Sequence, residues 1–144
     1  MRSSLRFFLA VFVSVSACAC SGSAGSGVSN SSSSSDPASD VTGHWSGRST
    51  SSTGFSAGFT ADLVQTGSAL SGSFRSSAAC IGGGKIEGTV AGDRIEATVT
   101  AGDVQATLTL TVSSDDQLDG TYDLPAAGAC PSDQGSVSMT RPGR

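Results

Sequence analysis

The stretch that decides the fold runs from Val104 to Val112 and reads Val-Gln-Ala-Thr-Leu-Thr-Leu-Thr-Val. Apolar residues occupy every even position of this stretch, and polar residues occupy every odd position between them. Successive side chains of a β-strand point to opposite faces of the sheet. The pattern therefore predicts a strand with one face against a protein core and the other face in water.

The same alternation recurs on both sides of this stretch, for example over residues 55–63 and 86–90. Short segments with turn residues, such as Gly92-Asp93 and Gly102-Asp103, separate the alternating stretches. Glycine and aspartate are typical of tight turns between strands. The sequence predicts about eight strands, at residues 41–49, 55–65, 69–76, 85–91, 94–101, 104–113, 117–124 and 134–141.

Each predicted strand has one apolar face, and no stretch of residues 41–144 has the apolar period of a helix that could cover these faces. The sheet must therefore close on itself or fold over. Most connections are short, which favours antiparallel pairing between neighbours in the chain. We predict an all-β fold with an antiparallel up-and-down barrel of about eight strands, and a β-sandwich is the alternative.

The first residues have the pattern of an export signal, with Arg2 and Arg6 around the start of an apolar run that ends at Val15. This run suits a signal peptide, whereas a membrane-spanning helix needs about 20 apolar residues. The sequence Val15-Ser-Ala-Cys18 resembles the lipobox of bacterial lipoproteins, in which an aliphatic and two small residues precede a cysteine. The resemblance implies that Cys18 is lipidated, with Cys20 as the alternative site. An ordinary cleaved signal also stays open.

The lipoprotein resemblance implies a protein of the cell envelope that its N-terminal lipid anchors to a membrane. Ala19 follows the cysteine, and the absence of aspartate there favours the outer membrane if the source has two membranes. Residues 21–40 are mainly glycine and serine, too polar to offset the entropy of ordering, so we expect a disordered tether. The predicted organisation is a signal peptide at 1–17, the lipidated cysteine and tether at 18–40, and the barrel at 41–144.

Cys80 and Cys130 lie in Gly/Ala-rich connections of the predicted barrel. In an exported protein two such cysteines are expected to form a disulfide, although two free thiols remain an alternative. We predict no metal at these cysteines because two sulfurs without a nearby histidine or a further cysteine make a poor zinc site.

The sequence offers no catalytic or cofactor motif. His44 is the only histidine, alternation points it outward, and no Gly-x-Ser-x-Gly motif accompanies it. The acidic residues within 115–123 are interpreted as solvated turn chemistry, and Gly82-Gly-Gly-Lys85 as a turn. We therefore expect no enzyme, no metal and no cofactor. Loss of Arg2 and Arg6 with the signal brings the formal charge from −4 to −6, which argues against nucleic acid as a partner.

Large side chains and glycines share the predicted inner face of the barrel. A small eight-stranded barrel is either filled by its own side chains or holds one small ligand. Glycines such as Gly72 and Gly120 either leave space or allow sharp curvature over a filled core. Inward polar groups are nearly absent apart from Gln65 and the Tyr122 hydroxyl, so we expect any ligand to be apolar. The candidates for the lining of a cavity are Trp45, Phe59, Phe74 and Tyr122.

Gly43-His-Trp45 at the start of the first predicted strand resembles the Gly-x-Trp signature of lipocalin-type and avidin-type barrels. In those families the tryptophan plugs or lines one end. This chain lacks the later lipocalin motifs and, because Trp45 is its only tryptophan, the tryptophan set of a biotin site. The resemblance implies the architecture and not the ligand. We predict a noncatalytic binding module for a small apolar ligand. The alternatives are a protein-interaction or inhibitor module with a filled barrel and an envelope protein as partner, and, last, a hydrolase.

Overall fold

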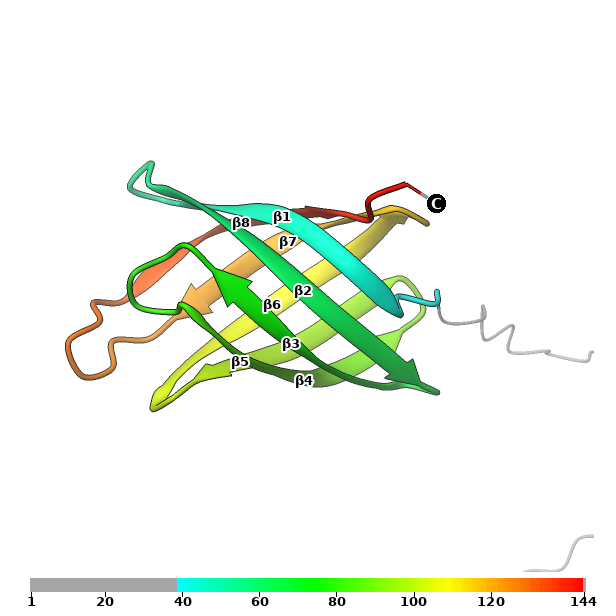
Figure 1. The fold of residues 1–144 in the computed structure, drawn as a ribbon, viewed down its shortest axis with the longest axis horizontal. Coiled ribbons are helices and arrows are strands. Elements are labelled where there is room, and N and C mark those ends of the chain that lie inside the picture. Colours follow the sequence, from blue (N-terminus) through cyan, green and yellow to red (C-terminus); the bar gives the residue numbers. More distant parts are fainter. Residues whose placement is uncertain (1–38, 144) are drawn as a thin grey trace, which may run out of the picture. The chain divides into compact units, whose positions relative to one another are not determined.

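Eight antiparallel strands pair in chain order, and the eighth also pairs with the first, so the sheet closes into a barrel (Figure 1). This computed structural model describes residues 39–143. The predicted all-β barrel is confirmed, and the sandwich alternative is wrong. The strands are β1 (Gly43–Ser51), β2 (Ser56–Thr66), β3 (Ala69–Ser76), β4 (Gly83–Ala91), β5 (Arg94–Ala101), β6 (Val104–Ser114), β7 (Gln117–Leu124) and β8 (Asp133–Thr140). Among residues 39–143, no helix is long and apolar enough to cross a membrane.

The strand ends agree with the sequence prediction to within two residues, because alternation and turn residues fix them together. Gly92 and Gly102 have positive φ values of 61° and 60° in the two-residue turns on either side of β5. Such values favour glycine. One difference lies at the start of β1, where the backbone N–H of Val41 donates to the side-chain oxygen of Gln65 and not to the backbone of a neighbouring strand. Val41 is therefore not paired in the sheet, and β1 begins at Gly43.

The connections alternate between the two ends of the barrel (Figure 1). We call the end with the two-residue turns 67–68, 92–93 and 115–116 the closed end. Both ends of the described chain also lie there, since Ser39 N–H donates to Gly92 O and Arg141 N–H donates to Asp116 O. The opposite end, which we call the open end, carries the connections 52–55, 77–82, 102–103 and 125–132.

Trp45 organises the core at the closed end and is 0% exposed. Its indole Nε1 donates to the carbonyl oxygen of Val41 at 2.9 Å. The Arg141 guanidinium lies 4.7 Å from the centre of the ring and also donates to Asp40 O at 3.0 Å. A cation over an aromatic face is attracted by the ring, and the buried indole N–H has its partner. Trp45 and its contacts therefore close this end of the barrel.

The inward glycines allow neighbouring strands to approach closely. A Cβ atom at Gly72 would overlap the carbonyl oxygen of Asp62 on β2, and one at Gly120 would overlap that of Thr109 on β6. Of the two roles considered for these glycines, empty space is excluded, because the neighbouring backbone occupies the position of the missing side chain. They do not mark the empty part of the interior, so enlarging them would strain the sheet.

Candidate ligand-binding cavity

A cavity of about 500 Å³ occupies the barrel interior towards the open end. All eight strands and three of the open-end connections contribute to its wall. Cavities that bind small molecules typically measure about 300–1,000 Å³ and have mainly apolar walls. The apolar residues of this wall include Phe59, Phe74, Ile86, Val99, Leu108, Val137 and Met139.

Three of the four predicted lining residues, Phe59, Phe74 and Tyr122, contribute to this wall. Trp45 does not, because it lies near the start of β1 and is fully buried at the closed end. Strand alternation gives the face to which a side chain points but not its depth along the barrel axis. Trp45 shares the inner face with the cavity residues and lies nearer to the closed end than they do.

A polar group lies at the open end of this wall, and the sequence predicted only one of its members, Tyr122. It consists of Ser51, Tyr122 and Asp133, and we call it the polar triplet. Tyr122 donates its hydroxyl hydrogen to Asp133 Oδ2 at 2.6 Å, and Ser51 donates to Asp133 Oδ1 at 2.6 Å. Ser51 is only 6% exposed. Buried polar groups need such partners to offset their lost hydration.

The sequence does contain a signal for the two missed residues. Ser51 continues the inward set of Trp45 to the end of β1, and Asp133 precedes Val137 on the inward set of β8. The predicted strands ended at residue 49 and began at residue 134, so both positions were left out. Extending each strand to its turn would have placed a serine and an aspartate inside.

The surroundings of the polar triplet shift two pKa values in opposite directions. Burial, followed by the hydrogen bond to Asp133 and its negative charge, raises the pKa of Tyr122 to about 12. Hydrogen bonds from Ser51, and then from Tyr122, lower the pKa of the Asp133 carboxyl below its ordinary value. A carboxylate that accepts several hydrogen bonds is stabilised in its charged form. At neutral pH the cavity wall therefore contains a carboxylate next to a neutral phenol.

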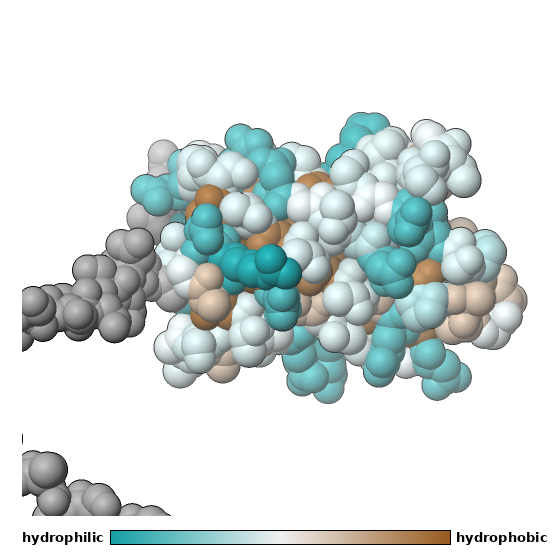
Figure 2. All heavy atoms as spheres, turned by 180° about the vertical axis from the view of Figure 1, so that it is seen from behind, coloured by the Kyte–Doolittle hydropathy of each residue, from teal (hydrophilic) through white to brown (hydrophobic). Residues whose placement is uncertain are grey.

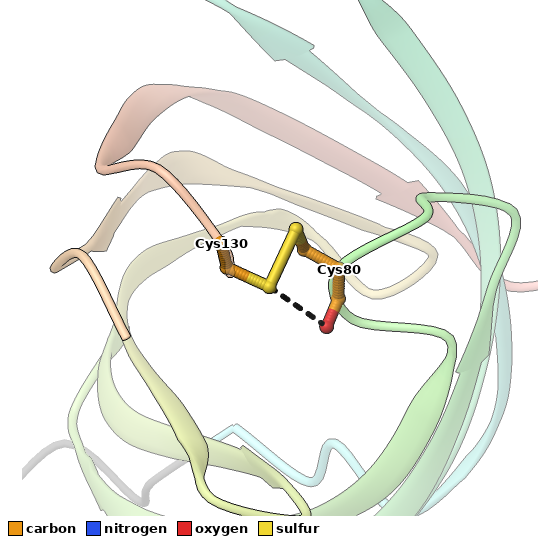
Figure 3. Close-up of a disulfide and its surroundings, with 2 residues drawn as sticks. All are labelled: Cys80 and Cys130. Carbon is orange, nitrogen blue, oxygen red and sulfur yellow. Dashed lines mark hydrogen bonds between the residues drawn. A yellow bond between two sulfur atoms is a disulfide. The ribbon is translucent and has the colours of Figure 1, made fainter. Parts of the chain in front are cut away.

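The predicted disulfide between Cys80 and Cys130 is present and joins connections 77–82 and 125–132 (Figure 3). The two Cα atoms are 5.6 Å apart, and Cys130 Sγ lies 3.8 Å from Cys80 O. Figure 3 shows the bridge within the ring of strands, across the opening of the barrel. Ala127 and Cys130 also exchange two backbone hydrogen bonds of 3.0 and 2.9 Å. The disulfide thus forms part of the rim of the cavity.

The remaining candidates from the sequence do not gather around the cavity. His44 is exposed, and its Nδ1 lies 2.8 Å from Asp62 Oδ1 on the outer wall. Asp119 accepts hydrogen bonds from Ser113 and Gln117, and a further one from Ser138 lowers its pKa most. In the part of the chain that the structure describes, no group of three or more His, Cys, Asp or Glu residues could hold a metal ion.

The predicted lipidation sites, Cys18 and Cys20, lie outside the described residues. The signal peptide at 1–17 and nearly all of the predicted tether do too. The structure therefore bears on the barrel alone, and membrane attachment stays a prediction from the sequence.

No protein-family model and no curated protein matches this sequence. Among solved structures, the chain is similar to that of EF1p2_mFAP2b bound to DFHBI, with a TM-score of 0.60 and 14% identity. The match covers 70% of this chain and 93% of the other. At this identity the likeness concerns the fold alone, and the described part of the chain shares the small antiparallel barrel of that structure.

Proposed function

We propose that this protein is a noncatalytic binding module that holds a small apolar ligand inside its barrel. The observation that carries the proposal is the cavity of about 500 Å³ with a mainly apolar wall. Each Å² of apolar ligand surface removed from water contributes on the order of 25 cal/mol. A ligand that enters this cavity removes apolar surface from water, because all eight strands contribute apolar residues to its wall.

Two further observations support binding inside the barrel. The structurally similar chain is described as bound to DFHBI, which accords with ligand binding in a barrel of this size. The alternative function assumed a filled barrel, and a cavity of about 500 Å³ disagrees with that assumption. Figure 2 shows one face of the outer wall, where hydrophilic and neutral residues dominate, and a group of moderately hydrophobic residues lies at the right end of the view.

We also propose that the module belongs to the cell envelope and is anchored to a membrane through lipid on Cys18. The lipobox-like sequence before Cys18 supports this proposal. Expression of the full chain in a bacterium, followed by membrane fractionation and intact-mass measurement, tests it. We expect a mature chain that begins with a diacylated Cys18, and release from the membrane in Cys18→Ser. A membrane-bound Cys18→Ser protein would contradict this anchor.

Binding in the cavity is tested by titration with a neutral apolar fluorescent probe that brightens away from water. We expect saturable binding at one site. Ala106→Phe should abolish it, because Ala106 is a buried residue of the cavity wall on β6. The matched control is Thr107→Phe, which adds a ring at the next residue, on the exposed side of the same strand. Absent binding in the wild type, or equal binding in Ala106→Phe, would overturn the proposal.

A further inference from the structure

We propose that the cavity selects apolar molecules that carry a protonated amine, whose ammonium group binds Asp133 at the open end, and that it disfavours apolar carboxylates. This inference rests on the proposed function, since it names the chemical class of the ligand for the same cavity. It is carried by the charge of the cavity wall and by the hydrogen-bonding capacity of the polar triplet.

The charge of the wall has one sign. Among the described residues that line the cavity, Asp133 is the only one with a charged side chain, and none is Lys, Arg or His. The basic residues nearest in sequence to the wall of β3 and β4, Arg75 and Lys85, are exposed on the outer face. A carboxylate with no compensating cation in a partly dehydrated site attracts positive charge and repels negative charge.

Within the polar triplet, the hydroxyl donors already have acceptors, whereas some acceptor positions have no donor. Ser51 and Tyr122 both donate their hydroxyl hydrogens to Asp133, and the Gln134 backbone N–H donates to Asp133 Oδ1 at 2.9 Å. Each carboxylate oxygen accepts about two hydrogen bonds, so Asp133 Oδ1 is occupied and Oδ2 has one position left. The Tyr122 oxygen can also still accept.

Thr53 completes this arrangement. Its hydroxyl lies 2.9 Å from Ser51 Oγ, and its backbone N–H donates to the same oxygen at 3.1 Å. Because the Ser51 hydrogen is directed to Asp133, the Thr53 hydroxyl must be the donor in this pair. No hydroxyl hydrogen of Ser51, Thr53 or Tyr122 is therefore left for a ligand. An ammonium group supplies the missing donors, whereas a carboxylate brings only acceptors and a second negative charge.

The position of Asp133 also fixes the orientation of the ligand. Asp133 is the first residue of β8 and lies at the open end, while Phe74 and Val137 are buried in the apolar wall. The ammonium group would lie near the rim, where water still solvates part of it. The apolar body would extend towards the closed end.

Three probes with the same hydrocarbon chain test the selection: decylamine, decanol and decanoic acid. Each is titrated against the protein with the neutral fluorescent probe bound, at a pH where the amine is protonated and the acid ionised. We expect the amine to displace the probe at a concentration roughly 10- to 100-fold lower than the acid, as a charge-assisted hydrogen bond would give. Decanol should fall between them.

Asp133→Asn removes the charge and should weaken binding of the amine about tenfold or more, leave decanol within about twofold, and strengthen binding of the acid. The matched control is Asp123→Asn, which removes an exposed carboxylate on the outer face of β7 next to Tyr122. This control should leave the binding of all three probes unchanged. If Asp133→Asn does not fold, the salt dependence of binding to the wild type decides. Added salt should weaken the binding of decylamine and leave the binding of decanol unchanged.

The outcomes separate the two proposals. If the neutral probe and all three ligands fail to bind, the proposed function is wrong. If they bind with equal affinity, or if the acid binds best, the proposed function stands and the selection of amines is overturned.

Discussion

The two ends of this barrel are formed by the same eight strands and differ in what their inward residues do. At the closed end, Trp45 fills the interior and holds Val41 and Arg141 through directed contacts. At the open end, the inward positions of the same strand are Ser49 and Ser51, which line a cavity. The comparison teaches that the packed core and the cavity are separated along the barrel axis. Along β1 the inward side chain thus changes from a large ring at the closed end to small hydroxyl groups at the open end.

The connections follow the same division. Two-residue turns join the strands at the closed end, whereas the open end carries connections that include 77–82 and 125–132. Longer connections lose more entropy on ordering, and the Cys80–Cys130 disulfide restricts them covalently. The open end therefore depends on a crosslink where the closed end depends on packing.

The largest expected effect is at the closed end. Trp45→Ala should lower the free energy of unfolding by about 3–5 kcal/mol, because it removes a buried ring and leaves a void. Because Trp45 is the only tryptophan, the variant has no tryptophan fluorescence to follow. Chemical unfolding is therefore followed by far-ultraviolet circular dichroism. Phe55→Ala at the open end is the control and should change stability by less than about 0.5 kcal/mol, because Phe55 is 62% exposed. Similar losses in both variants would remove the distinction between the ends.

The next effect concerns the crosslink. Replacing Cys80 and Cys130 together by serine should lower stability by about 2–4 kcal/mol, since the bond closes a loop between residues 50 apart in sequence. Hydrogen exchange should rise first in connections 77–82 and 125–132. If exchange instead rises equally around Trp45, the two ends unfold as one unit and the division fails.

The same substitution made at both ends sharpens the comparison further. Ala61→Phe should lower stability by about 1–3 kcal/mol, because Ala61 pairs with Trp45 in the packed region and has no space beside it. Ala106→Phe, in the cavity wall, should change stability by less than about 1 kcal/mol, since the ring enters empty space. Thermal unfolding of both variants measures the contrast. The reverse order would mean that the cavity collapses in solution.

The smallest effect is a titration at the open end. Tyr122 is the only tyrosine, so the absorbance of its phenolate reports its pKa, which we expect at about 12 instead of its ordinary 10.0. The folded protein holds this proton more tightly than the unfolded chain does. The resulting stability is therefore fully present below pH 10.0 and is lost as the pH rises towards about 12.

Asp133→Asn separates the causes of this shift. The pKa of Tyr122 should fall only part of the way, because burial is its largest cause and the carboxylate comes second. An unchanged pKa in Asp133→Asn would show that the two side chains do not interact in solution. A wild-type Tyr122 that titrates at its ordinary pKa would show that the polar triplet is open to water.

The fold could be predicted from the sequence because alternation, turn residues and the lack of a covering helix all indicate the same closed sheet. The disulfide could be predicted because an expected oxidising compartment favours pairing of two cysteines that lie in connections of the same barrel. The cavity could be predicted only in part. Alternation places Trp45 and Phe59 on one face but does not tell which of them lies deeper.

Two members of the polar triplet were missed for a related physical reason. Asp133 and Ser51 lie at strand ends, where polar residues are common in turns and strand limits are uncertain by one or two residues. A shift of a single residue decides whether such a side chain is counted inside the barrel or in a loop. The glycines were ambiguous in the same way, because only the neighbouring carbonyl oxygens show that Gly72 leaves no empty space.

An even number of strands in chain order returns the polypeptide to the end where it started, and here both Ser39 and Arg141 lie at the closed end. An attachment that continues the chain before Ser39 or after Arg141, whether a linker or a fused reporter, therefore starts at the end of the barrel farthest from the cavity opening. The cavity opening then faces away from the point of attachment. This geometry makes the barrel a suitable scaffold for a sensor that is tethered at its closed end.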